Sequence, residues 1–183
     1  MGYKRKNLFK SSLMIVLYFF QEGNPNMQTG TIISMFQMYT MPNGKSIDLD
    51  QLGLAMEDSD LGNSYFLNLN TGELVFFSDF LGLSEEDEHL LDEIDGSDDY
   101  VAVERIRSYV AYQWMADFVD EVVAPADEHA ADRLARALHG KRVFRRFKDT
   151  LYNVDERWQQ AWYQWRDEKL NAAAEEWLKS LWE

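Results

Sequence analysis

The stretch Phe144-Arg145-Arg146-Phe147-Lys148-Asp149 decides the fold together with the aromatic segments that come after it, which are Trp158, Trp162-Tyr163, Trp165-Arg166 and Glu176-Trp177-Leu178. Large apolar residues recur here at intervals of three and four, which is the spacing of one helix face. One helix is expected to bury Phe144, Phe147 and Leu151. A last helix, with Asp155 as its cap, carries one broad stripe: Trp158, Trp162, Trp165, Leu170, Ala173, Trp177 and Leu181. This stripe is interpreted as core rather than as an aromatic platform for a ligand, with Tyr163 and Trp182 exposed.

The region before these helices has the pattern of a small sheet. Residues 65–69 and 74–77 are rich in apolar and aromatic side chains, and between them Gly72 can adopt the positive φ of a tight turn. Residues 100–103 are a third candidate strand. Helical spacing appears in residues 47–56, with Ser46 or Asp48 as cap, in 109–123, with Ser108 as cap, and in 130–138, closed by Gly140. We therefore expect an α+β fold: a small antiparallel sheet of about three strands covered by a C-terminal helical half, in a single domain of residues 41–183.

Residues 1–40 do not share this pattern. Lys4-Arg5-Lys6 and the apolar run Leu13–Phe20 resemble parts of a signal peptide, but no small-x-small cleavage pattern comes after them. The run is also too short to span a bilayer, which takes about 20 residues. The preferred interpretation is an upstream extension or a disordered, apolar arm, and the alternatives are a signal or anchor and an interaction arm. Without an anchor the expected localisation is cytoplasmic, which suits the absence of cysteine.

The chain is strongly acidic. Its 183 residues contain 18 Lys and Arg against 32 Asp and Glu, a net charge of −14, and residues 41–183 alone carry −17. Such a domain repels nucleic acids and anionic membranes and favours a basic protein as partner. The acidic run Glu85–Asp99 is not a calcium loop, because taking Gly96 as the central glycine places Leu91 and Ala102 at ligand positions. A solvated helix or loop, loose binding of divalent cations and mimicry of DNA phosphates remain as interpretations of this run.

Five basic residues between Lys141 and Lys148 stand out against this charge. They can neutralise nearby carboxylates such as Asp149, or they can form a patch for phosphate or nucleic acid beside aromatic side chains. Arg145 and Arg146 are the preferred binding candidates, because guanidinium groups make bidentate contacts. Lys148 and Tyr163 complete the candidate set. A nucleic-acid partner is expected only through Arg145 and Arg146.

The sequence offers no constellation for catalysis. His89, His129 and His139 are scattered, and Asp127-Glu128-His129 with Asp132 is interpreted as a solvated helix start. There is no glycine-rich phosphate loop, nucleophile elbow or His-Glu-x-x-His helix. No catalytic residue, metal ligand or cofactor is therefore assigned.

Several segments together resemble a bacterial uncharacterised protein family of small acidic proteins, across roughly residues 43–180. They are Ile47-Asp48-Leu49-Asp50, Tyr65-Phe66-Leu67 with Thr71-Gly72-Glu73, the Phe144–Asp149 block, and Trp162-Tyr163 through Glu176-Trp177-Leu178. The resemblance implies an α+β fold and a bacterial origin, and it supplies no catalytic residues. The expected function is a non-catalytic protein-binding or regulatory module with a basic partner. A DNA-mimic inhibitor of a nucleic-acid-binding protein and a metal-dependent hydrolase using the acidic surface are the alternatives.

Overall fold

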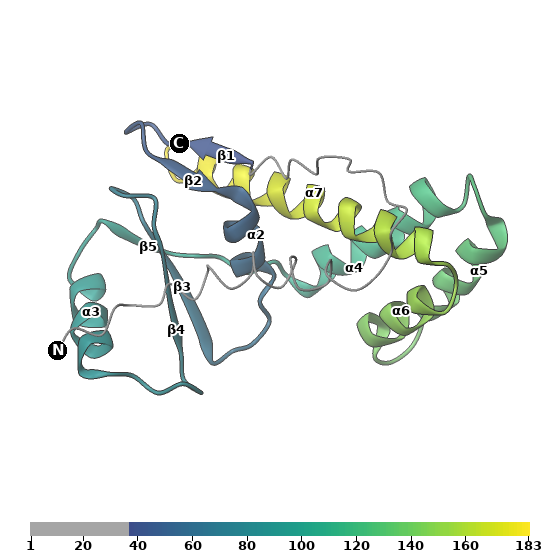
Figure 1. Cartoon of the computed structure of the whole chain (residues 1–183), viewed down its shortest axis with the longest axis horizontal. Helices are drawn as coiled ribbons and strands as arrows, with labels where there is room; N and C mark the ends of the chain where they lie inside the picture. The colour runs from purple at the N-terminus through teal and green to yellow at the C-terminus, as the bar shows by residue number, and fades with distance from the viewer. Residues whose placement is uncertain (1–36) are drawn as a thin grey trace, which may run out of the picture. The chain divides into compact units, whose positions relative to one another are not determined.

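The computed structural model of the chain describes residues 37–183 (Figure 1). The interpretations of Lys4–Lys6 and Leu13–Phe20 lie outside the described residues. The described part begins with a two-stranded antiparallel sheet of β1 (Met38–Thr40) and β2 (Ser46–Asp48), in which Tyr39 pairs with Ile47. Sequence periodicity does not predict this sheet, because strands of three residues are too short to show an alternation. The compact unit therefore starts before Met41.

The expected three-stranded sheet is confirmed. It consists of β3 (Asn63–Asn68), β4 (Leu74–Ser78) and β5 (Tyr100–Ala102), all antiparallel and in the order β4-β3-β5. Gly72 in the β3–β4 turn has φ +77°, and a Cβ there would lie 2.8 Å from the carbonyl oxygen of Ser46. Both the conformation and this close approach to β2 require glycine. α3 (Glu85–Asp95) links β4 to β5 and lies beside the strands in Figure 1.

A short helix, α2 (Leu49–Glu57), packs against the long C-terminal helix α7 (Glu156–Ser180). Of the two caps expected for α2, Asp48 is the one used: its carboxylate accepts hydrogen bonds from the backbone N–H groups of Asp50 and Gln51. The buried residues of this region form one apolar cluster, the sheet-side core: Ile47, Leu49, Leu52, Met56, Leu67, Ala174, Trp177 and Leu178.

The helical half comprises α4 (Ser108–Asp117), a π-helix η1 (Phe118–Val123), α5 (Glu128–Ala137), α6 (Val143–Tyr152) and the first half of α7. Ser108 is the first residue of α4 and not its cap, which is Arg107 without a side-chain hydrogen bond. The buried residues form a second cluster, the helical core: Met115, Phe118, Val119, Val123, Ala130, Ala131, Leu134, Leu138, Phe147, Leu151, Trp158 and Trp162. The spacing of Phe144 predicts that it belongs to this core, but its side chain is 40% exposed.

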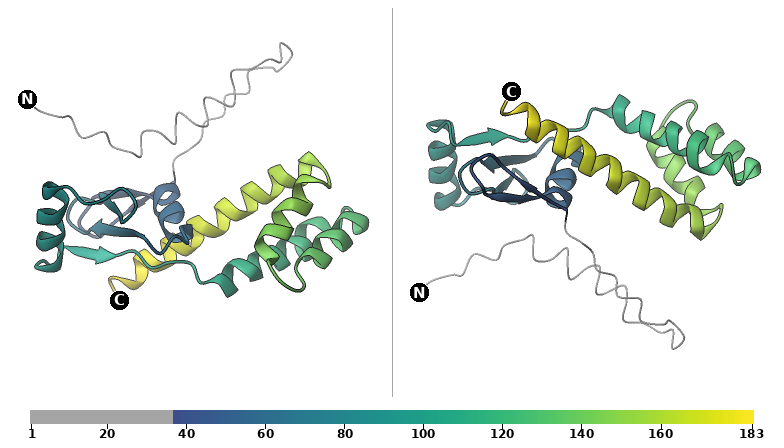
Figure 2. Two further views of the ribbon diagram at one scale, coloured as in Figure 1. Left: turned by 90° about the horizontal axis from the view of Figure 1, so that it is seen from below. Right: turned by 90° about the horizontal axis from the view of Figure 1, so that it is seen from above.

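Helix α7 joins the two cores, and Figures 1 and 2 show it running from α6 at its start to α2 near its end. Trp158 and Trp162 belong to the helical core, whereas Ala174 and Trp177 belong to the sheet-side core. At about 100° per residue, these two pairs point in directions roughly 110° apart around the helix. The broad apolar stripe expected from the sequence is therefore shared between two cores, one at each end of the helix. No helix in residues 37–183 has the length and apolar character needed to cross a membrane.

Candidate partner-binding surface

The negative charge is concentrated in the part of the chain that contains the sheets, α2 and α3. Between Lys45 and Arg105 the sequence has 17 Asp and Glu and no Lys or Arg. Arg105 and the 12 Lys and Arg after it nearly balance the 14 Asp and Glu that follow Arg105 in the chain. A surface on which one sign of charge dominates attracts partners of opposite sign. The segregation extends well beyond the run Glu85–Asp99, which is only its densest part.

Helix α3 forms in spite of its charge because its start is well capped. The Ser84 hydroxyl accepts a hydrogen bond from the Asp87 backbone N–H, and the Asp87 carboxylate accepts one from the Ser84 N–H at 3.0 Å. Acidic residues in the first turn also interact favourably with the helix dipole. Ile94 is the one buried residue of α3 and is in neither core cluster, so the helix presents most of its surface to solvent.

The exposed carboxylates of α3 are available to a partner. None of the following forms an ion pair with another residue in the range 37–183: Glu85, Glu86, Glu88, Asp92, Glu93 and Asp95. This contrasts with the helical half, where the described Asp127, Asp132 and Asp149 each have an arginine within 4 Å.

Large apolar side chains are exposed in the segment between β4 and α3 and in the turn before β3. We call them the apolar tip: Leu61, Phe80, Leu81 and Leu83, with exposed fractions of 88%, 95%, 65% and 44%. The backbone N–H of Asp79 donates to the carbonyl of Gly62 at 2.8 Å. Leu61 precedes Gly62 and Phe80 follows Asp79, so the two exposed side chains come from neighbouring segments. Sequence reasoning missed the tip, because a short apolar run before an acidic helix is equally consistent with burial.

The four binding candidates from the sequence lie in different surroundings. The Arg145 Nε is 3.6 Å from an Asp149 carboxylate oxygen, and both side chains are exposed. Arg146 donates to the backbone carbonyls of Arg136, at 3.0 Å, and His139, at the C-terminal end of α5. The two adjacent arginines therefore have different contacts, and those of Arg146 link α6 to the end of α5.

Lys148 and Tyr163 also have different surroundings. The Tyr163 hydroxyl is 2.9 Å from that of Tyr152, and the Arg166 guanidinium lies over its ring at 5.5 Å. The Tyr152 contact and partial burial raise the pKa of Tyr163. Lys148 instead lines a groove between helices. The described contacts do not bring the four candidates into one site.

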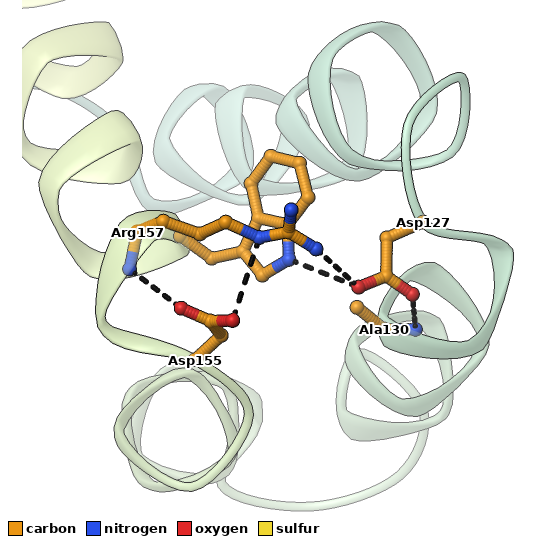
Figure 3. A network of polar contacts seen from close by, with 5 residues as sticks. Asp127, Ala130, Asp155 and Arg157 are labelled. Atoms are coloured by element: carbon orange, nitrogen blue, oxygen red, sulfur yellow. Dashed lines mark hydrogen bonds and ion pairs between the residues drawn. The ribbon is translucent and has the colours of Figure 1, made fainter.

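Asp127 organises a polar network at the start of α5 (Figure 3). Its carboxylate accepts from the Ala130 backbone N–H at 2.9 Å, from Arg157 at 2.7 Å and from the Trp158 indole N–H at 3.5 Å. The hydrogen bond from Ala130 is the main reason that the pKa of Asp127 is lowered, with smaller contributions from Trp158 and Arg157 against the opposing effect of desolvation. The expected helix start is confirmed, and its carboxylate is paired with arginine.

The described residues contain no group of three or more His, Cys, Asp or Glu side chains placed to hold a metal ion. What this part of the chain presents is therefore a surface of exposed carboxylates next to exposed apolar side chains.

Fold and surface together define a two-core α+β domain with an acidic sheet side. The model of the uncharacterised protein family UPF0158 matches residues 45–181, and the chain belongs to this family. A relative from Pseudomonas aeruginosa, named UPF0158 protein PA5073, is 29% identical over 134 residues, which are 73% of this chain and 82% of the relative. No solved structure matches the chain.

Proposed function

We propose that this chain is a non-catalytic protein-binding module whose partner is a basic protein, and that the apolar tip and α3 form the binding surface. The observation that carries the proposal is the 95% exposure of Phe80 directly before an acidic helix. Contiguous exposed apolar residues rimmed by charged ones are typical of interaction sites. The absence of Lys and Arg between Lys45 and Arg105 supports a cationic partner.

The two parts of the surface have different roles in this proposal. Apolar side chains of the partner cover Phe80 and Leu81 and remove them from water, which contributes about 25 cal/mol per Å² of apolar area. Lys and Arg of the partner lie against the carboxylates of α3, where they speed association and fix orientation more than they add affinity. The partner segment is therefore amphipathic and basic.

Comparative affinity capture tests the proposal. The full chain and its Phe80→Ser/Leu81→Ser variant are used as bait at low salt, and the captured proteins are identified and then measured singly for Kd. Tyr109→Ser is the matched control, since Tyr109 is 67% exposed but lies in the helical half. We expect basic partners that the tip variant loses and the control retains. Capture of neutral or acidic proteins alone contradicts the proposal.

The two alternative functions, a DNA-mimic inhibitor and a metal-dependent hydrolase, predict different observations. For a DNA-mimic inhibitor the partner is a nucleic-acid-binding protein, and duplex DNA competes with this chain in a salt-dependent manner. For a metal-dependent hydrolase a cluster of metal-ligating side chains is needed, and residues 37–183 provide none on which to build that mechanism.

A further inference from the structure

A groove of about 610 Å³ lies between α2, α4, α6 and α7. No residue of the apolar tip lines this groove, so a ligand in the groove does not depend on the proposed function. The volume falls within the range of roughly 300–1,000 Å³ that is usual for small-molecule sites. Four elements from both halves of the chain contribute to its walls, so the groove is a product of tertiary packing.

Eight of the fourteen residues that line the groove are apolar or aromatic. Met115, Phe147 and Trp162 are buried members of the helical core that also line the groove. Leu54 on α2 and Phe144 on α6 line it as well and remain 47% and 40% exposed. An apolar ligand would cover these two side chains, and their removal from water favours its binding.

Three of the four charged side chains in the groove already have partners. Arg166 lies 3.8 Å from the Glu57 carboxylate and 2.8 Å from that of Asp167. The Asp58 carboxylate accepts hydrogen bonds from the Tyr65 hydroxyl at 2.8 Å and the Asn63 amide at 2.7 Å. These contacts satisfy two carboxylates and one guanidinium within the protein.

Lys148, the fourth charged side chain of the groove, has no such partner in the described residues. Within residues 37–183 its ammonium group forms no hydrogen bond and no ion pair, although acidic residues are abundant in the chain. The hydroxyls of Ser59 and Ser108 line the same groove and offer further donors. The groove therefore combines apolar and aromatic side chains with one available positive charge.

We propose that this groove binds a small amphipathic monoanion, an apolar carboxylic acid in its ionised form, with the carboxylate at Lys148 and the apolar part against Phe144 and Trp162. Charge complementarity selects the anion, since Lys148 is the one groove cation without a partner in the described residues. A more highly charged head group fits less well, because Glu57 and Asp58 also line the groove and the chain carries −14.

Octanoate and 1-octanol are suitable probes, because they share an apolar chain and differ in charge. Binding to the full chain is measured by tryptophan fluorescence, which reports on Trp114 and Trp162 in the groove wall, and by calorimetry. We expect saturable binding of octanoate that is tighter than that of octanol. Lys148→Met should weaken octanoate binding about ten-fold or more, as for loss of a hydrogen bond to a charged group, and leave octanol binding unchanged.

Two further variants locate the effect. Arg145→Met removes the same charge from the same helix at a residue that does not line the groove, so octanoate affinity should stay within about two-fold of the wild type. Ala111→Leu narrows the groove and should weaken both probes. Equal affinity for octanoate and octanol, equal effects of Lys148→Met and Arg145→Met, or no saturable binding overturns the proposal. The first comparison uses the wild-type chain and is independent of how any variant folds.

Discussion

Gly53 in α2 lies so close to Leu170 in α7 that a Cβ on Gly53 would be 3.0 Å from the Leu170 Cβ. One residue further along α7, the buried Asn171 amide donates to the Asp50 carboxylate of α2 at 2.8 Å. Glycine weakens a helix by about 1 kcal/mol relative to alanine. Here that cost accompanies a close helix–helix approach, which places α2 and its apolar residues against the second half of α7.

Gly53→Val should therefore destabilise the domain. Its added side chain cannot fit beside Leu170 without separating the helices, and such overpacking typically costs about 1–3 kcal/mol. The measurement is the free energy of unfolding in urea. Leu54→Val is the control, since it places the same β-branched residue at the next, exposed position of α2. Equal stability of Gly53→Val and the wild type would show that α2 and α7 are not packed this closely.

The adjacent residues Arg145 and Arg146 should behave differently when each is replaced by alanine. Arg146→Ala removes donors to two backbone carbonyls at the end of α5, so we expect a loss of about 1–2 kcal/mol. Arg145→Ala removes one exposed i,i+4 ion pair, which is worth roughly 0.5 kcal/mol or less. Urea unfolding of both variants checks this, and equal effects would argue against the capping role of Arg146.

The same pair tests the nucleic-acid hypothesis for the basic segment. Retention of the chain on duplex DNA or RNA at low salt, lost in Arg145→Ala, would support that role. Arg145 is the informative position, because its variant should leave the fold intact. No retention of the wild-type chain at low salt would remove the hypothesis.

Much of the fold could be predicted because its signals are local. The turn at Gly72 and the apolar strands beside it indicate a hairpin, and Asp48 and Asp155 cap helices as expected. The division of α7 between two cores could not be predicted, since it depends on which distant elements pack against each half of the helix. The exposure of Phe144 has the same origin. Its spacing places it on the same helix face as Phe147, but only Phe147 is fully covered by other elements of the described chain.

The candidate surface was less predictable than the fold. The spacing of apolar residues around Phe80 and Leu81 assigns them to no helix or strand face. Only the tertiary structure shows that nothing in residues 37–183 covers them. The basic segment is conspicuous because its composition is unusual for this chain. Its cations have different local contacts, which composition cannot reveal.

Trp162 should be essential for the helical core. Its ring packs edge-on against Phe118 and Phe147, with centroid distances of 5.3 and 5.0 Å. Trp162→Ala should cost about 3–5 kcal/mol, as is usual for truncation of a buried aromatic residue, whereas Trp182→Ala, at a 41% exposed position, should cost far less. Thermal unfolding checks both variants, and Trp162→Phe serves if the alanine variant does not fold. Similar effects at the two positions would contradict the assignment of Trp162 to the core.

Asp127→Asn should lower stability at neutral pH and have less effect in acid. Asparagine can still cap α5, but it cannot pair with Arg157 as a charge. The pKa of Asp127 is lowered by folding, mainly through the hydrogen bond from Ala130. The stabilisation is therefore fully present above the unfolded-state value of about 3.9 and is lost as the pH falls through the lower folded-state pKa.

The measurement for this variant is the free energy of unfolding of wild type and Asp127→Asn at several pH values from about 7 down to about 2, in the acid range where carboxylates take up protons. The difference between the two proteins should shrink towards the acid end. Asp132→Asn on the same helix is the control, because its ion pair with Arg136 is longer, at 3.5 Å, and exposed. A difference for Asp127→Asn that stays constant with pH would show that its hydrogen-bond geometry, and not its charge, stabilises the network. That outcome would also make the Arg157 contact at 2.7 Å energetically neutral, as many exposed ion pairs are.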